Sequence, residues 1–300
     1  MLSEIQILRP ENLELLARQV VEGFITGLHK SPYHGFSVEF AEHRQYNSGE
    51  SVRNIDWKLY ARTERLYVKR FEEETNLRCR ILIDQSGSMY FPDSGLSKLQ
   101  FSILGAASIM HLMKMQRDAV GLTLFDSTIQ TQTEVRSSGS HHIQLLQFLT
   151  QLYQTKSGNS GTGLVDTLHE IAERIHRRSM VIIFSDMFDS NDPDAVFDAL
   201  QHLKYNKHEV ILFHTQHAPM ELEFDYQNRP YTFQDSETGE RIRLFPSEVR
   251  EAYVDRMNQF HRELKFRAAQ YRIDLIEADV SKPIDQILIP FLVKRQRMRG

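Results

Sequence analysis

The sequence predicts an α/β fold with a doubly wound, mostly parallel sheet flanked by helices. In the larger, C-terminal part of the chain, short β-branched or apolar runs alternate with longer amphipathic runs, which is typical of βαβ units. Three short runs, at 81–84, 181–186 and 210–214, are almost continuously apolar, as expected for strands covered on both faces. The runs at 119–125 and 129–134 are separated by only three residues, so they predict an antiparallel hairpin at an edge.

Each element of this sheet is predicted from its pattern. The predicted strands lie at residues 78–84, 119–125, 129–134, 180–186, 209–214 and 272–277. The predicted helices lie at residues 98–115, 141–153, 163–177, 194–203, 247–271 and 284–297. Helix-start residues support several of these ranges, including Ser97, Pro193 and Pro246.

Residues 1–76 fall outside this alternation and predict an N-terminal helix and β extension. A helix is expected near 11–28, and the segments 37–46 and 66–71 alternate well enough for an antiparallel pair. A polar segment containing Trp57 lies between those two segments. We therefore place a domain boundary between residues 76 and 77.

The second domain, residues 77–300, carries one insertion at about 217–245. This segment is rich in Pro, Asp, Glu and Gln, has alternating aromatic residues, and contains the turn sequence SETGE. It predicts a β-hairpin between a strand and the long helix that follows.

Composition and charge exclude several classes of protein. The chain has 300 residues and a formal net charge of -4, which gives no reason to expect a nucleic acid as partner. Its single cysteine, Cys79, suits a reducing compartment, so we expect a cytoplasmic protein. The N-terminus has no secretory pattern, and no apolar run is long enough to span a membrane.

Five oxygen-bearing side chains follow or end predicted elements. Asp84, Ser86 and Ser88 form a D-x-S-x-S pattern where a strand ends, and alternation directs all three toward one side. Thr162 lies in a Gly- and Ser-rich loop before a helix, and Asp186 ends another apolar strand. In doubly wound sheets, ligands gather beyond the carboxyl ends of the strands, where the strand order reverses.

Oxygen donors without Cys or His favour a hard cation, Mg²⁺ first, with Mn²⁺ or Ca²⁺ as alternatives. Two acids and three hydroxyls leave such an ion short of ligands, so water completes its shell and an incoming carboxylate can replace that water. The plainer alternative is that the two aspartates are helix N-caps and the hydroxyl residues are turn formers.

These residues resemble a known site. The order D-x-S-x-S, a Thr after a Gly-rich loop, and an Asp ending an apolar strand is similar to the metal-ion-dependent adhesion site of von Willebrand factor A (vWA) domains. The segment 49–74 and the hairpin sequence FQDSETGERIRLFPSEVREAY resemble the bacterial family called domain of unknown function 58. The matching residues of the first segment are Arg53, Asp56, Trp57, Ala61, Arg62, Val68, Phe71 and Glu74. Glu50 departs from the family, which more often has Asp there.

The resemblance implies a vWA-like fold and a metal held by the five residues above. It also implies a MoxR-type AAA+ ATPase as partner, acting in maturation or assembly of a client protein that offers an acidic residue. Related domains shift their last helix when ligand binds, which here corresponds to 284–297.

Two other functions remain open from the sequence. A metal-dependent hydrolase is conceivable, but the chain lacks G-x-S-x-G and G-K-[ST] motifs, and Ser86 stands where an aspartyl phosphatase usually has its second carboxylate. We therefore expect no catalytic residues and no enzyme. A metal-free scaffold could instead bind through Arg53, Asp56, Trp57 and Arg62, although we favour a structural role for these residues.

Overall fold

The computed structural model divides the chain into two compact units. It describes residues 10–28, 43–45, 57–69, 77–155, 163–176, 178–187, 193–235 and 239–298. Met1–Leu28 and Leu77–Gly300 form the larger unit, and His29–Asn76 form the smaller one. The larger unit contains the sheet and is described first.

The sheet has six strands in the order β10-β7-β6-β3-β4-β5. All neighbours are parallel except β4 and β5, which are antiparallel. The strands are β3 (Arg78–Asp84), β4 (Ala119–Phe125), β5 (Ile129–Gln132), β6 (Met180–Ser185), β7 (Glu209–Gln216) and β10 (Asp274–Asp279). From β3 the chain builds outward through β4 and β5 and then returns to β6 on the other side of β3. The strand order therefore reverses between β3 and β6, which is the position where such sheets bind ligands.

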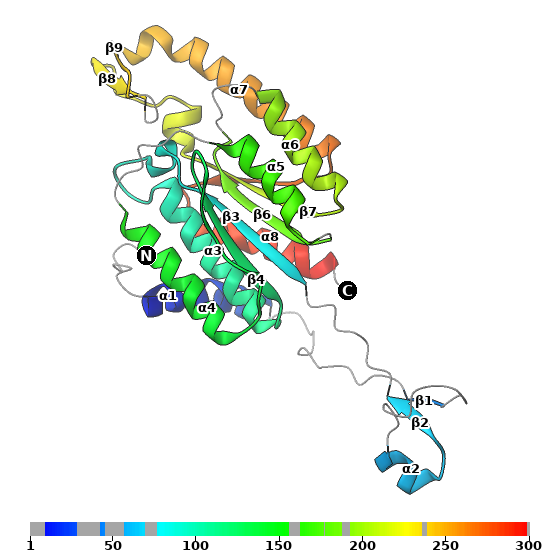
Figure 1. Cartoon of the computed structure of the whole chain (residues 1–300). Coiled ribbons are helices and arrows are strands. Elements are labelled where there is room, and N and C mark those ends of the chain that lie inside the picture. The colour runs from blue at the N-terminus through cyan, green and yellow to red at the C-terminus, as the bar shows by residue number, and fades with distance from the viewer. Residues whose placement is uncertain are drawn as a thin grey trace. The chain divides into compact units, whose positions relative to one another are not determined.

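Helices cover both faces of the sheet (Figure 1). One face packs against α3 (Lys98–Met115), α4 (Gly139–Gln154) and α8 (Ile284–Met298), and α1 (Pro10–Leu28) packs on these three helices. The other packs against α5 (Leu164–Arg174), α6 (Pro193–Tyr205) and α7 (Pro246–Gln270). The predicted doubly wound, mostly parallel α/β fold flanked by helices is thus confirmed.

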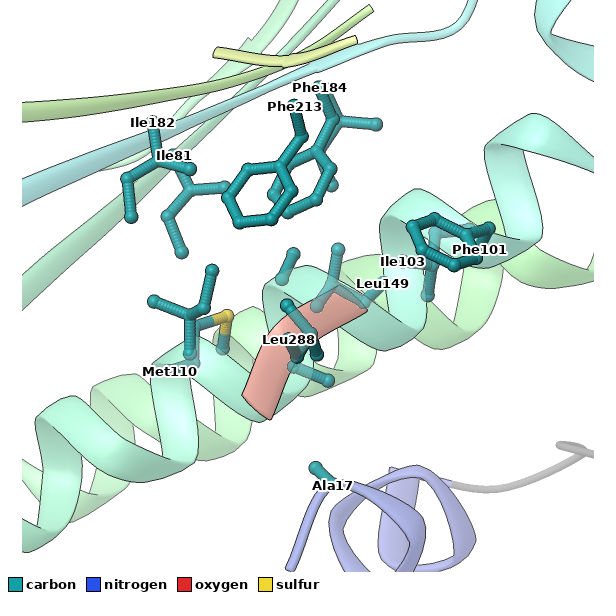
Figure 2. Close-up of a cluster of buried hydrophobic side chains, with 14 of the residues drawn as sticks. Ala17, Ile81, Phe101, Ile103, Met110, Leu149, Ile182, Phe184, Phe213 and Leu288 are labelled. Atoms are coloured by element: carbon teal, nitrogen blue, oxygen red, sulfur yellow. The ribbon is translucent and has the colours of Figure 1, made fainter. Parts of the chain in front are cut away.

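Alternation along the strands directs side chains into two separate cores. Figure 2 shows Ile81, Ile182, Phe184 and Phe213 of the sheet above the helices of one face. The rings of Phe184 and Phe213 stack with centroids 4.6 Å apart. Gly105 of α3 accommodates this pair, since a Cβ there would lie 2.9 Å from the Phe184 ring. Helix and sheet therefore approach closely at the middle of this core.

α1 belongs to the sheet unit and not to the extension. Its Leu13, Leu16, Ala17 and Val20 recur at helical spacing and are buried in the core beside α3 and α8. The sequence placed α1 with the rest of residues 1–76, whereas these contacts separate it from His29–Asn76. Sequence periodicity identifies an apolar face but does not say which surface will cover that face.

The smaller unit contains a short antiparallel pair and one helix. β1 (His43–Gln45) pairs with β2 (Tyr67–Lys69), within the two segments predicted for such a pair. α2 (Trp57–Thr63) was not predicted, since the sequence there reads as a polar segment. Trp57 is 59% exposed and meets Tyr60 edge-on, with ring centroids 6.1 Å apart.

The insertion after β7 consists of a helical turn and a hairpin. η3 (Ala218–Leu222) is a short π-helical segment, and β8 (Tyr231–Gln234) pairs antiparallel with β9 (Arg241–Leu244). Phe224 meets Tyr253 of α7 with ring centroids 4.5 Å apart, which attaches the insertion to that helix. The predicted hairpin is confirmed, whereas η3 was not predicted.

None of the helices within the described ranges combines the length and the apolar character that crossing a bilayer needs.

Candidate metal centre

Asp84 is fixed by hydrogen bonds at both carboxylate oxygens. It is the last residue of β3, and its register places it one step beyond the pair Ile83 and Phe184. The backbone N–H of Ser86 donates to Oδ1 at 2.9 Å, and the Ser185 hydroxyl donates to Oδ2 at 2.8 Å. Asp84 is only 1% exposed, so the strand end and these two donors determine its orientation.

Ser86 and Ser88 lie side by side in the turn that follows β3. Gly87–Tyr90 form a short 3-10 turn, which brings the Ser86 and Ser88 hydroxyl oxygens to 3.2 Å from each other. Ser86 is fully buried and Ser88 is half-buried. The D-x-S-x-S pattern thus brings one carboxylate and two hydroxyls together, with Ser88 the most accessible of the three.

Asp186 follows β6 and is fully buried beside the same strand ends. Its backbone oxygen contacts Nε2 of His214 at 2.9 Å. Burial, and secondarily the neighbouring His261, lowers the pKa of His214 to about 3. His214 is therefore neutral at physiological pH and can donate this hydrogen bond, which orients the Asp186 backbone.

The carboxylates of Asp84 and Asp186 are close enough to influence each other. Burial, and then the charge of Asp186, raises the pKa of Asp84, while the hydrogen bonds from Ser86 and Ser185 act in the opposite direction. Two buried carboxylates that repel each other are stabilised by a cation placed between or beside them.

Lys98 is the residue of this centre that the sequence analysis missed. Its Nζ lies 2.8 Å from Oδ2 of Asp186 and 2.6 Å from Oε1 of Glu221, and the side chain is 1% exposed. Burial by itself lowers the pKa of Lys98, but the two carboxylates outweigh burial and raise the pKa overall. One signal could have found it: Lys98 is the first residue of α3, where the helix dipole disfavours a cation.

Thr162 lies outside the described residues, but the next residue is well placed by its contacts. The N–H of Gly163 donates to the backbone oxygen of Asp126 at 2.6 Å, next to the end of β4. A Cβ on Gly163 would lie 2.2 Å from the backbone oxygen of Ser127. The start of α5 is therefore held against the β4–β5 turn, and only glycine fits at this position.

The donor set fits a hard divalent cation. Asp84, Ser86, Ser88 and Asp186 offer two carboxylates and two hydroxyls from one edge of the sheet. Mg²⁺ prefers such oxygen ligands and keeps part of its water shell. Within the described ranges, no group of three or more His, Cys, Asp or Glu residues could hold a metal, so hydroxyls are needed to complete any set.

A family comparison covers most of the chain. Residues 42–264 match the model of the family described as protein of unknown function DUF58. The chain belongs to the DUF58 family. The match includes the smaller unit from residue 42 onward, all of β3 and β6, and the β8–β9 hairpin.

Curated relatives from mycobacteria share part of this DUF58 chain. Uncharacterized protein Mb1516 of Mycobacterium bovis and uncharacterized protein MT1527 of Mycobacterium tuberculosis are each 26% identical over 174 residues. The matched region is 58% of this chain and 55% of each relative. The chain therefore spans about half the length of the curated relatives it matches.

Three solved structures resemble the chain at low sequence identity. The conserved hypothetical protein BatB from Bacteroides thetaiotaomicron has a TM-score of 0.46 at 15% identity, covering 74% of this chain and 99% of its own. An aerotolerance-related membrane protein from Bacteroides fragilis has a TM-score of 0.46 at 17% identity, covering 70% and 96%. The PilB minor pilin from Streptococcus sanguinis has a TM-score of 0.40 at 9% identity, covering 77% and 64%.

Proposed function

We propose that this DUF58 protein is a non-enzymatic adaptor that binds a partner protein through a divalent cation. The observation that carries the proposal is the convergence of Asp84, Ser86 and Ser88 beside Asp186, where the strand order reverses. The proposal takes Thr162 as a third hydroxyl ligand, because it directly precedes the anchored Gly163 in the sequence.

The hydroxyl residues and the carboxylates of the site have different roles in holding the ion. Ser86, Ser88 and Thr162 act as direct ligands, and the carboxylates of Asp84 and Asp186 orient these hydroxyls or the bound waters. When bound, Mg²⁺, or alternatively Mn²⁺ or Ca²⁺, supplies a coordination position that an incoming carboxylate can take. Ser88 is the most exposed described member of the set, so the partner approaches from its side.

The partner is a MoxR-type AAA+ ATPase, and the pair acts on a client protein that offers an acidic side chain. Family resemblance supports this choice, as does a cation with an open position, which suits a carboxylate. We place this activity in the cytoplasm, on the basis of the single, buried Cys79.

The surroundings of the carboxylates favour binding over catalysis. Lys98 holds Asp186, and two hydrogen bonds hold Asp84, so neither carboxylate is arranged as a mobile base. His214 is fully buried and contacts a backbone oxygen. General-base catalysis needs a group within reach of the substrate proton, and these groups face inward.

Calorimetry on matched serine variants tests the proposal. Mg²⁺ and Mn²⁺ are titrated into the wild type and into Ser86→Ala/Ser88→Ala, first alone and then with acetate or the candidate ATPase present. We expect weak ion binding that the carboxylate strengthens and that the double variant loses. Ser108→Ala/Thr150→Ala is the control, since it removes two hydroxyls that bond to helix carbonyls elsewhere.

The same experiment separates the rival functions. Partner binding that survives chelation and Asp84→Ala would favour a metal-free scaffold that uses the exposed Trp57. Turnover of generic phosphoester or peptide substrates, lost in the serine variant, would favour a hydrolase. Absence of ion binding by the wild type, with and without partner, would overturn the proposal.

A further inference from the structure

A buried ammonium lies between two carboxylates from different parts of the chain. Lys98 reaches Asp186 at the end of β6 with Nζ to Oδ2 at 2.8 Å, and Glu221 of η3 with Nζ to Oε1 at 2.6 Å. Lys98 and Asp186 are each 1% exposed at the side chain, and Glu221 is 16% exposed. The group therefore connects the metal centre with the insertion that follows β7.

The position of Lys98 within α3 points to a role at this centre. It is the first residue of the helix and lies between Ser97 and Gln100, which form the capping box. The partial positive charge of a helix N-terminus disfavours a lysine there, and burial disfavours its charge further. The carboxylates of Asp186 and Glu221 compensate both effects, so the lysine is held in place by these two partners.

Glu221 is bound at both of its carboxylate oxygens. Lys98 takes Oε1, and the backbone N–H of His217 donates to Oε2 at 2.6 Å. The His217 ring meets Phe91 edge-on, and the Phe91 ring centroid lies 6.0 Å from Lys98 Nζ. If the ammonium moves, the contacts of Glu221 and of the His217 ring change with it, and both residues belong to the start of η3 or adjoin it.

We propose that Lys98 is the resident counter-ion of the metal centre and that Glu221 is its alternative acceptor. This inference rests on the proposed function. A cation that shares Asp186 competes with the ammonium for that carboxylate, because like charges repel. Glu221 stabilises the ammonium after it leaves Asp186, so ion binding and the position of η3 are coupled.

The proposal makes opposite predictions for the two residues. Lys98→Met removes the ammonium that competes with the ion and leaves the carboxylates of Asp84 and Asp186 to the ion. We therefore expect Mg²⁺ to bind about tenfold more tightly. Glu221→Gln removes the alternative acceptor and leaves Lys98 committed to Asp186, so we expect binding about fivefold weaker. If Lys98 and Glu221 only supported the fold, both substitutions would shift the Mg²⁺ affinity in the same direction.

Calorimetric titration of Mg²⁺ into both single variants and into Lys98→Met/Glu221→Gln measures these shifts. The double variant removes one charge of each sign and keeps the result interpretable if Lys98→Met alone does not fold. Lys114→Met/Glu14→Gln is the matched control, since it neutralises another ion pair of α3, with Nζ to Oε1 at 2.7 Å. We expect the control to bind like the wild type.

Hydrogen exchange supplies a readout that does not depend on affinity. We expect added Mg²⁺ to change the exchange of the backbone amides of residues 217, 218 and 220–222 in the wild type and to leave them unchanged in Glu221→Gln at saturating ion. If Lys98→Met and Glu221→Gln shift the Mg²⁺ affinity in the same direction, or if neither shifts it, the coupling between ion binding and η3 is overturned. The adaptor proposal would stay intact. Absence of ion binding by both the wild type and Lys98→Met would overturn both.

Discussion

The two ends of α3 each carry a lysine paired with a carboxylate, but the two pairs differ in burial. At the first turn, Lys98 lies 2.8 Å from Asp186, and both side chains are 1% exposed. At the last turn, Lys114 lies 2.7 Å from Glu14 of α1, with exposures of 41% and 33%. The donor-acceptor distances are almost equal, so distance does not distinguish the pairs.

Burial and helix position do distinguish them. Lys114 lies at the helix C-terminus, where the helix dipole favours a positive charge. Water screens its pair with Glu14, so this ion pair contributes little to the free energy of unfolding. Lys98 opposes the polarity of the helix N-terminus and is removed from water, and the carboxylates of Asp186 and Glu221 compensate these two costs. An unfavourably placed buried charge is therefore a better indicator of a functional site than an ion pair of ideal length.

The largest expected effect comes from removing the buried lysine. Lys98→Ala leaves Asp186 and Glu221 close together without their cation, which costs about 3 to 5 kcal/mol of unfolding free energy. Urea denaturation at neutral pH and without metal measures this loss. Lys114→Ala is the control and should cost less than about 1 kcal/mol. Equal costs for the two variants would show that burial does not separate the pairs.

A smaller effect is expected where the loop of the metal centre meets the β4–β5 turn. Gly163→Ala places a Cβ against the backbone oxygen of Ser127, so we expect a loss of about 1 to 3 kcal/mol and weaker Mg²⁺ binding. Thermal denaturation and calorimetry measure the two quantities. Gly139→Ala at the start of α4 is the control, since a Cβ there meets nothing within 4 Å. Similar losses in both variants would contradict the steric explanation.

The Lys114 end of α3 should respond to pH through a buried histidine. Burial, and secondarily the charge of Lys114, lowers the pKa of His142 from 6.5 to about 4. The unfolded chain therefore binds more protons between these values. The stability that the folded protein gains from keeping His142 neutral is fully present above pH 6.5. It is lost as the pH falls toward 4, by at most about 1.4 kcal/mol of unfolding free energy per pH unit.

Denaturation midpoints between pH 7 and pH 4 test the role of His142. His142→Gln cannot titrate, so its stability should fall less steeply over this range than that of the wild type. Parallel pH profiles for the two proteins would contradict the assignment.

The smallest effect is expected for the exposed ion pair between Lys114 and Glu14. A double-mutant cycle on Lys114→Ala and Glu14→Gln should give a coupling energy of about 0.2 to 1 kcal/mol that decreases at high salt. A coupling of several kcal/mol, independent of salt, would mean that this pair resembles the buried one.

Much of the fold could be predicted from local patterns. Continuous apolar runs identified the central strands, and helix-start residues such as Ser97 and Pro246 placed α3 and α7 within a residue of their observed starts. The hairpin insertion followed from alternating aromatics and a turn sequence. These features depend on neighbours in the sequence, so a single chain contains the information.

Features that depend on distant contacts were not predicted. α2 lies in a polar segment without a strong period, and the burial of α1 against α3 depends on a surface more than 70 residues away in the sequence. Arg53, Asp56 and Thr162 lie outside the described residues, so their expected roles stay predictions.

For the candidate centre, the sequence by itself determined the oxygen donors. Asp84, Ser86 and Ser88 are spaced at intervals of two residues at a strand end, and the 3-10 turn that follows brings their side chains together locally. Only the tertiary structure decided that Lys98 and Glu221 join Asp186, because β6, α3 and η3 are distant in the sequence. A charge is placed by the residues that surround it in space, and these are known only once the chain has folded.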